Sequence, residues 1–241
     1  MHVDVFFTRH EFTRANRDGL DYPIIVIDVL RASSTLIQAL SVGARPIYII
    51  STPMEAFKLK EKLGDAVLLC GEREGLIIDG FDMGNSPLEY TRQRVGGRPL
   101  IFCSSNGSQT LLAAAKKSSN VLLGGFVNLS ALVERIIKYD RVDIICSGKL
   151  GRYCNEDVFC AGMIIQTLIN KEAKPVMDSD SATAANWLFE RYLSDPRDAL
   201  ELSEHPVYLS MELNYTEDVA FCTNLDSHSV VPFFKDGVLS L

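Results

Sequence analysis

The chain has 241 residues, of which 47% are hydrophobic and 23% are charged, a composition typical of a globular protein with a substantial core. Its formal net charge of −7 argues against a general nucleic-acid binder, because no excess of basic residues is available to neutralise phosphates. No apolar run approaches the length of a membrane span and the six cysteines form no C-x-x-C pair, so we expect a cytoplasmic protein with buried free thiols and no membrane partner.

Short apolar runs alternate with helical stretches along the first two thirds of the chain. In chain order, we expect a strand at Val3–Phe7, a strand at Ile24–Ile27, a helix at Ala32–Val42, a strand at Pro46–Ile50, a helix at Met54–Leu63, a strand at Ala66–Leu69, a strand at Pro99–Cys103, a helix at Gln109–Lys117, a strand at Val121–Leu123, a helix at Asn128–Lys138, a strand at Val142–Cys146 and a helix at Asp157–Ile169. Asp178–Leu213 reads as polar and helical, and Val230–Phe234 reads as a short last strand.

This alternation predicts an α/β fold, with a mostly parallel sheet between two layers of helices in a three-layer α/β/α sandwich. No low-complexity linker interrupts the chain, so residues 1–241 are expected to form a single unit. Ser33–Leu40 weakly resembles Ala161–Leu168, which leaves open two similar, tightly packed subdomains with a boundary near residues 115–125.

The segment Cys70–Tyr90 is the most polar stretch that directly follows an expected strand. It reads CGEREGLIIDGFDMGNSPLEY, and its chemistry-bearing residues are Glu72, Arg73, Glu74, Asp79, Asp82, Asn85, Ser86 and Glu89. Glycine lets the backbone approach a ligand closely, and carboxylates beside an arginine suit a metal ion with an anionic substrate. A solvated loop with turn glycines is the alternative interpretation.

Three further polar loops follow expected strands, and the carboxyl ends of parallel strands are where α/β proteins bind ligands. Asp28–Thr35 offers a carboxylate that could bind Mg²⁺ or attack phosphorus, Arg31 as a phosphate or sulfonate clamp, and the hydroxyls of Ser33, Ser34 and Thr35 at a helix N-terminus. As structural alternatives, Asp28 would cap a helix and Arg31 would form a surface ion pair.

The segment Ser104–Ser108 also precedes an expected helix, and its hydroxyls and glycine suit oxyanion binding. It lacks the lysine of a P-loop, so nucleotide binding is not indicated. The fourth loop, Ser147–Arg152, follows Cys146 and completes a C-x₅-R spacing that recurs in cysteine-dependent phosphatases. Glu156 and Asp157 follow closely and would oppose a thiolate, although they could also cap a helix or join a Mg²⁺ site.

Taken together, these motifs resemble the 2-phosphosulfolactate phosphatase family. The resemblance rests on DVLRASST from Asp28, GER from Gly71, GFDMGNSPLEY from Gly80, SNGS from Ser105 and EDxxCAG from Glu156. It extends from about Val3 to Pro232 and includes Asp218–Cys222, Asp226 and Val231-Pro232 near the end of the chain. Two departures are Glu74, where the family usually has glycine, and serine instead of threonine in Ser104–Ser108.

The resemblance implies an α/β enzyme that hydrolyses 2-phospho-3-sulfolactate to sulfolactate and phosphate with Mg²⁺, a step of coenzyme M synthesis in methanogens. The small anionic phosphoester would be the ligand partner, and a homo-oligomer, with a dimer as the working hypothesis, is expected. Glu74 adds a negative charge, which leaves the identity of the anionic substrate open.

We therefore predict a Mg²⁺-dependent phosphatase, in which catalysis depends on positioning and charge stabilisation. The expected metal ligands are Asp28, Glu72, Asp82 and Asp157; the expected catalytic residues are Asp28, Arg31, Arg73 and Asn85; and the expected substrate contacts are Ser34, Ser86, Ser104, Ser105, Asn106 and Gly107. A metal-free cysteine phosphatase using Cys146 and Arg152 and a non-catalytic anion-binding protein are the two competing hypotheses.

Overall fold

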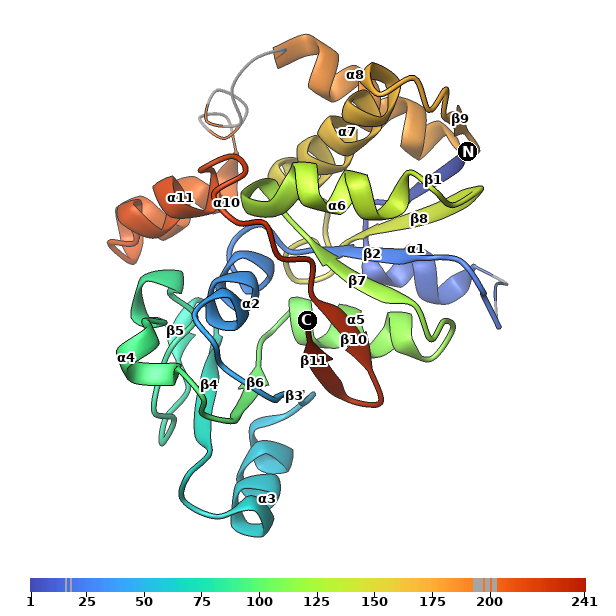
Figure 1. Cartoon of the computed structure of the whole chain (residues 1–241). Coiled ribbons are helices and arrows are strands. Elements are labelled where there is room, and N and C mark those ends of the chain that lie inside the picture. The colour runs from blue at the N-terminus through green and yellow to red at the C-terminus, as the bar shows by residue number, and fades with distance from the viewer. Residues whose placement is uncertain (16, 18, 193–196, 198–199, 201–202) are drawn as a thin grey trace.

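The structure is a computed structural model that describes residues 1–15, 17, 19–192, 197, 200 and 203–241. Its described strands form one sheet with helices on both sides (Figure 1). Across the sheet, the strands follow the order β5 (Leu76–Ile77), β4 (Leu68–Arg73), β6 (Leu100–Cys103), β3 (Ile47–Ile49), β11 (Val238–Ser240), β10 (Phe233–Lys235), β7 (Val121–Gly124), β2 (Ile24–Ile27), β8 (Arg141–Cys146), β1 (His2–Phe6) and β9 (Val176–Met177). The expected α/β fold with a mostly parallel sheet is confirmed.

The sheet contains two groups of parallel strands joined by a C-terminal hairpin. One group is β4, β6 and β3, and the other is β7, β2, β8, β1 and β9. The hairpin β10–β11 lies between β7 and β3, and its three antiparallel pairings reverse the strand direction between the groups. The proposed division into two subdomains near residues 115–125 stays a prediction. β7 lies within that region, and β1 and β2, which precede it in the chain, belong to the same strand group as β7.

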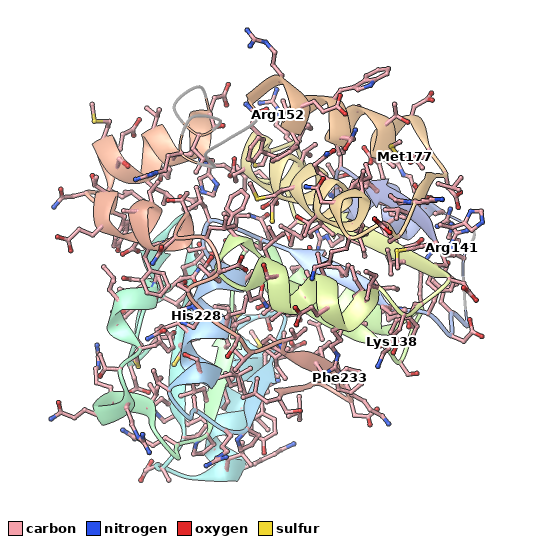
Figure 2. All side chains as sticks on the ribbon, turned by 45° about the horizontal axis from the view of Figure 1, so that its top comes forward. Lys138, Arg141, Arg152, Met177, His228 and Phe233 are labelled. Carbon is pink, nitrogen blue, oxygen red and sulfur yellow. The ribbon has the colours of Figure 1, made fainter. Side chains whose placement is uncertain are left out.

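The hairpin has a turn that its sequence favours. Asp236 and Gly237 connect the paired residues Lys235 and Val238, and both have positive φ, at 51° and 80°. An Asp-Gly pair with positive φ at both positions is the hallmark of the type I′ turn, whose twist matches that of the strands it joins. The expected strand at Val230–Phe234 thus begins later, at Phe233 (labelled in Figure 2), because Pro232 has no N–H to donate to a ladder.

The helices cover the two faces of the sheet with separate apolar clusters. The described α-helices are α1 (Arg9–Arg14), α2 (Ala32–Ser41), α3 (Pro53–Leu63), α4 (Arg92–Val95), α5 (Gly107–Ala115), α6 (Leu129–Ile136), α7 (Asn155–Asn170), α8 (Asp180–Tyr192), α10 (Glu204–Val207) and α11 (Thr216–Cys222). On β2, Ile25 and Ile27 join one cluster with α6, α7 and α8, whereas Ile24 and Val26 join another with α1, α2 and α5. This alternation along a fully buried strand explains why the sequence shows a continuous apolar run there.

Two expected elements differ from those observed. The strand expected at Ala66–Leu69 begins at Leu68 and continues to Arg73, so it enters the polar stretch and pairs there with β5. The segment expected to be helical at Asp178–Leu213 contains α8, α10 and a π-helical turn at Tyr208–Glu212, and part of it lies outside the described residues. No helix in the described part of the chain is long and apolar enough to cross a membrane.

The hairpin that joins the two strand groups provides a stability test. Phe234 on β10 is fully buried in the cluster with α2 and α5. We expect Phe234→Ala to lower the free energy of unfolding by about 3–5 kcal/mol, because it removes a large buried ring and leaves a cavity. Urea unfolding followed by circular dichroism measures this change. Lys235→Ala, at the exposed next position, is the matched control, and equal midpoints for the two variants would contradict the role given to the hairpin.

Candidate active site

A cavity of about 300 Å³ lies where the carboxyl ends of strands from both parallel groups meet. Asp28 follows β2, Glu72 lies near the end of β4, and Ser105 follows β6. The cavity is lined by Asp28, Leu30, Arg31, Glu72, Glu74, Gly75, Asn85, Ser105, Asn106, Lys149, Leu150, His205, Tyr208 and Leu209. All four loops singled out in the sequence therefore contribute residues to one cavity.

Asp28 is buried at the start of α2, where its carboxylate serves partly as a helix cap. Its Oδ1 accepts a hydrogen bond from the Ala32 amide at 3.2 Å, and its own amide donates to Ser33 Oγ at 2.9 Å. No described residue donates a hydrogen bond to Oδ2. Burial, together with the negative charge of Glu72, raises the pKa of Asp28 to about 7, although His205 opposes the rise.

Glu72 ties together two loops that border the cavity. Its Oε1 accepts a hydrogen bond from the Ser105 amide at 2.7 Å, and its Oε2 accepts one from the Gly75 amide at 2.9 Å and one from Ser105 Oγ at 3.3 Å. Glu72 therefore holds its carboxylate at a fixed place in the same cavity as Asp28.

Arg31 is held rigidly at the cavity wall by partners far away in the sequence. Its Nη1 donates to Asp218 Oδ2 at 2.5 Å, its Nη2 donates to the Gly75 carbonyl at 2.6 Å, and its guanidinium lies 4.0 Å from the centre of the Tyr215 ring. Ser86 Oγ donates to the other oxygen of Asp218 at 2.7 Å. A buried arginine held in this way keeps a fixed orientation, which suits recognition of a phosphate or sulfonate.

The N-terminus of α5 approaches Asp28 closely because its first residue is glycine. A Cβ atom at Gly107 would lie 2.8 Å from Asp28 Oδ2 and 2.6 Å from the Ala32 Cβ atom. Any larger residue at position 107 would therefore push Asp28 and Ala32 away from α5. Asn106 Oδ1 accepts a hydrogen bond from the Leu150 amide at 3.3 Å and thereby connects α5 to the loop after β8. The positive ends of α2 and α5 thus face the same carboxylate, where a helix dipole favours negative charge.

Several residues expected in the site act elsewhere. Asp82 is partly exposed and binds Lys60 Nζ at 3.0 Å and the Leu69 amide at 2.8 Å, so it closes a turn behind β4. Arg73 donates to the Glu72 and Ser51 carbonyl oxygens and to Cys103 Sγ. Neither side chain lines the cavity, so the structure does not bring Asp82 and Arg73 together with the other expected site residues.

The remaining expected residues support the loops without lining the cavity. Asp157 accepts hydrogen bonds from the Val29 and Gly148 amides, both at 2.9 Å, and burial beside Asp28 raises its pKa well above the usual range. Ser34 Oγ donates to the Val29 carbonyl, and Ser104 Oγ accepts from the Ser108 amide. Five expected residues therefore lie beside the cavity without lining it: Asp157, Ser34, Ser86, Ser104 and Gly107.

Other residues of the site were not expected from the sequence. Lys149 lines the cavity with its Nζ 4.0 Å from the centre of the Tyr208 ring, and Tyr208 in turn donates to the Glu74 carbonyl at 3.2 Å. Leu150, His205 and Leu209 complete this wall. Lys149 lies in the polar loop that follows an expected strand, so its position and charge could have identified it as a site residue from the sequence. The sequence around Tyr208 has no pattern that places it near the carboxyl ends of the strands.

The structure argues against a cysteine nucleophile at Cys146. This residue ends β8 inside the apolar cluster, where burial beside Asp157 raises the pKa of its thiol well above the usual range. Arg152, labelled in Figure 2, is exposed and lines a different cavity. A thiolate is the form that attacks phosphorus, so the C-x₅-R spacing here does not create that chemistry.

The donor set of the main cavity fits a hard divalent cation. Asp28, Glu72 and Glu74 provide three carboxylates against the side chains of Arg31 and Lys149. Asn85 also lines the cavity, and its buried Oδ1 has no hydrogen-bond partner among the described residues. Carboxylate and amide oxygens are the ligands that Mg²⁺ takes in proteins, and an unpaired buried acceptor is costly unless something binds it.

Comparisons with known proteins agree with this geometry. The family model described as 2-phosphosulpholactate phosphatase matches residues 10–237. Among curated relatives, a protein of Carboxydothermus hydrogenoformans is 37% identical over 235 residues, which cover 96% of this chain and 92% of that protein. A protein of Caldanaerobacter subterraneus subsp. tengcongensis is 35% identical over 226 residues, which cover 93% of this chain and 92% of that protein. Both are named "Probable 2-phosphosulfolactate phosphatase".

The raised pKa of Asp28 predicts a site that destabilises the metal-free fold at neutral and alkaline pH. The pKa of about 7 in the folded protein exceeds the ordinary aspartate pKa of 3.8, so ionisation of this group lowers stability as the pH rises from about 4 to 7. We expect Asp28→Asn to raise the free energy of unfolding by about 1–4 kcal/mol at pH 8 in the presence of chelator, and to have no such effect near pH 4.

Urea unfolding of both proteins across this pH range measures the difference. Glu74→Gln removes an exposed carboxylate from the same cavity and is the matched control, with little change expected at any pH. A stability gap that is independent of pH would contradict the assignment to Asp28.

Proposed function

Because the chain belongs to the 2-phosphosulfolactate phosphatase family, whose members are phosphoric monoester hydrolases, we propose that its main cavity binds 2-phospho-3-sulfolactate and hydrolyses it to 3-sulfolactate and phosphate. The resemblance inferred from the motifs is confirmed by the family match over residues 10–237. Beyond family membership, we propose the identity of the substrate and a requirement for a metal ion.

The balance of charges on the cavity wall is the observation that carries the proposal. A substrate with phosphate, sulfonate and carboxylate groups is strongly anionic, yet Asp28, Glu72 and Glu74 outnumber Arg31 and Lys149. Such a wall binds a polyanion only when a cation offsets the carboxylates. We propose Mg²⁺, held by Asp28, Glu72 and the unpaired Oδ1 of Asn85.

Asp82 and Asp157 are left out of this ligand set for structural reasons. Asp82 is paired with Lys60 outside the cavity, and Asp157 does not line the cavity. A bound Mg²⁺ would supply Lewis-acid polarisation of a phosphoryl oxygen and a more acidic water.

The protein's own contribution is positioning and charge stabilisation, on which phosphoryl transfer mainly depends. Arg31 presents a guanidinium whose orientation is fixed by Asp218, Gly75 and Tyr215, so little reorganisation is needed as charge develops on the phosphoryl group. Lys149 supplies a second positive charge from the opposite loop, after β8. Ser105 and Asn106 add polar groups at the start of α5.

The attacking oxygen can come from water or from Asp28. Its Oδ2 has no described donor, which leaves that atom available for a metal or for phosphorus. Attack by Asp28 would form an aspartyl phosphate that water then hydrolyses, whereas direct attack by water forms no covalent intermediate. Acid quenching during turnover, followed by mass measurement of the intact protein, separates these two routes.

The six cysteines support a proposed cytoplasmic location, since all six are free and buried, as expected in a reducing compartment. A role in coenzyme M synthesis stays a prediction from the resemblance, and a homodimeric state stays a working hypothesis.

Phosphate release from 2-phosphosulfolactate tests the function. We expect turnover with Mg²⁺ and at least a hundredfold loss with excess chelator, because the carboxylate-rich wall then repels the substrate. A panel of small phosphoesters without the sulfonate should react more slowly. Release only from other esters would reject the proposed substrate, undiminished release under chelation would reject the metal, and tight binding without turnover would favour an anion-binding protein.

Conservative replacement of two arginines tests the assignment of Arg31. We expect Arg31→Lys to lower kcat/KM by about 10²-fold, because an ammonium group cannot hold Asp218 and the Gly75 carbonyl while contacting substrate. Arg73→Lys is the matched control, and its kcat/KM should stay within about twofold of the wild-type value, since Arg73 does not line the cavity. A larger loss in Arg73→Lys than in Arg31→Lys would overturn the assignment.

A further inference from the structure

We propose that the chain contains a second metal site, distinct from the oxygen-rich site of the main cavity, in which Cys154, Glu156 and His205 bind a transition-metal dication of the zinc class. One potential ligand atom from each of these residues lies within 4.8 Å of the others. All three side chains line a second cavity, of about 560 Å³, which gives an ion a path from solvent.

The local structure directs these three side chains toward one another. Cys154 is the N-cap residue of α7, but its side chain makes no capping hydrogen bond. Glu156 lies in the first turn of α7 and is almost fully buried. His205, on α10, reaches across from the tail of the chain, and its Nδ1 lies 2.8 Å from Glu156 Oε1.

The distances require only small side-chain adjustments. Zinc–nitrogen, zinc–oxygen and zinc–sulfur bonds of about 2.0–2.3 Å place tetrahedral ligand atoms roughly 3.5 Å apart. Atoms already within 4.8 Å reach that separation through side-chain rotation, without movement of α7. Glu156 and His205 already meet through the 2.8 Å hydrogen bond, and an ion bound by both side chains would replace that hydrogen bond and widen their separation.

The chemistry of the donors selects the metal. A thiolate and an imidazole favour zinc and its neighbours in the transition series, whereas Mg²⁺ prefers oxygen ligands only. On binding, the Cys154 thiol releases its proton to solvent, and the thiolate and the Glu156 carboxylate together balance the two charges of the ion. Three protein ligands leave a fourth coordination position for water or another ligand.

The position of the site connects it to the main cavity. His205 lines both cavities, so a metal ion bound to it fixes part of the wall that faces Asp28. The alternative is a structural contact between His205 and Glu156 beside an inert thiol, which needs no ion. The two interpretations differ in whether Cys154 can become a metal ligand.

Cobalt binding tests the proposal with a spectroscopic readout. The full-length protein is stripped with chelator, dialysed and titrated with Co²⁺ in the presence of excess Mg²⁺, which occupies the oxygen site. We expect a near-ultraviolet sulfur-to-cobalt charge-transfer band that saturates at about one equivalent, as a thiolate ligand requires. Zn²⁺ should abolish the band by displacing Co²⁺, as the order of metal affinities indicates.

Variants identify the ligands. Cys154→Ser should eliminate the charge-transfer band and weaken Zn²⁺ binding at least tenfold, whereas Glu156→Gln should weaken binding but keep the band. Cys70→Ser is the matched control, because Cys70 is a buried cysteine on β4 outside both cavities, and it should behave as the wild-type protein does. Circular dichroism establishes that each variant is folded.

Absence of the band in the wild-type protein, or its persistence in folded Cys154→Ser, would overturn the proposal. These measurements use no phosphoester, so they can succeed or fail independently of the proposed phosphatase activity.

Discussion

The site depends on the burial of four carboxylates within a small volume. Asp28, Glu72, Glu156 and Asp157 are each less than one-tenth exposed. Buried carboxylates are tolerated only when hydrogen-bonded or paired, and here much of the bonding comes from backbone amides of the loops that follow the strands. The loops after β2, β4, β6 and β8 are therefore folded around the carboxylates, and the shape of the cavity follows from satisfying them.

The hydrogen bonds to these carboxylates do not remove their mutual repulsion. Burial and neighbouring carboxylates raise the pKa values of both Asp28 and Asp157, so the metal-free protein carries an electrostatic cost at neutral pH. A bound cation is the direct way to offset that cost. If the proposed Mg²⁺ binds there, relief of this repulsion would contribute to its affinity, as expected where function and maximal stability conflict.

Much of the fold and about half of the candidate site could be predicted from the sequence. Asp28 and Ser105 follow continuous apolar strands, and that local pattern was enough to place them at strand ends. The distinction between Glu72 and Arg73 was harder because both lie in one polar stretch. Once β4 is known to continue through them, alternation puts neighbouring side chains on opposite faces, with Glu72 toward the cavity and Arg73 toward Ser51.

The antiparallel hairpin between the two strand groups was not predicted, although its Asp236-Gly237 turn was a readable signal. Without the hairpin, the sheet was expected to have one continuous carboxyl edge. In the structure the two groups run in opposite directions, and residues at the carboxyl ends of β2, β4 and β6 nevertheless line the same cavity.

The tail of the chain completes the site through contacts that no local pattern reveals. Asp218 pairs with Arg31 at a separation of 187 residues, and His205, Tyr208 and Leu209 form one wall of the cavity. Asp218 also accepts a hydrogen bond from Ser86, so one buried carboxylate joins the tail, α2 and the polar stretch after β4. Because Arg31 would be a buried, unpaired charge without Asp218, the main cavity can exist in this form only after the tail has packed onto both strand groups.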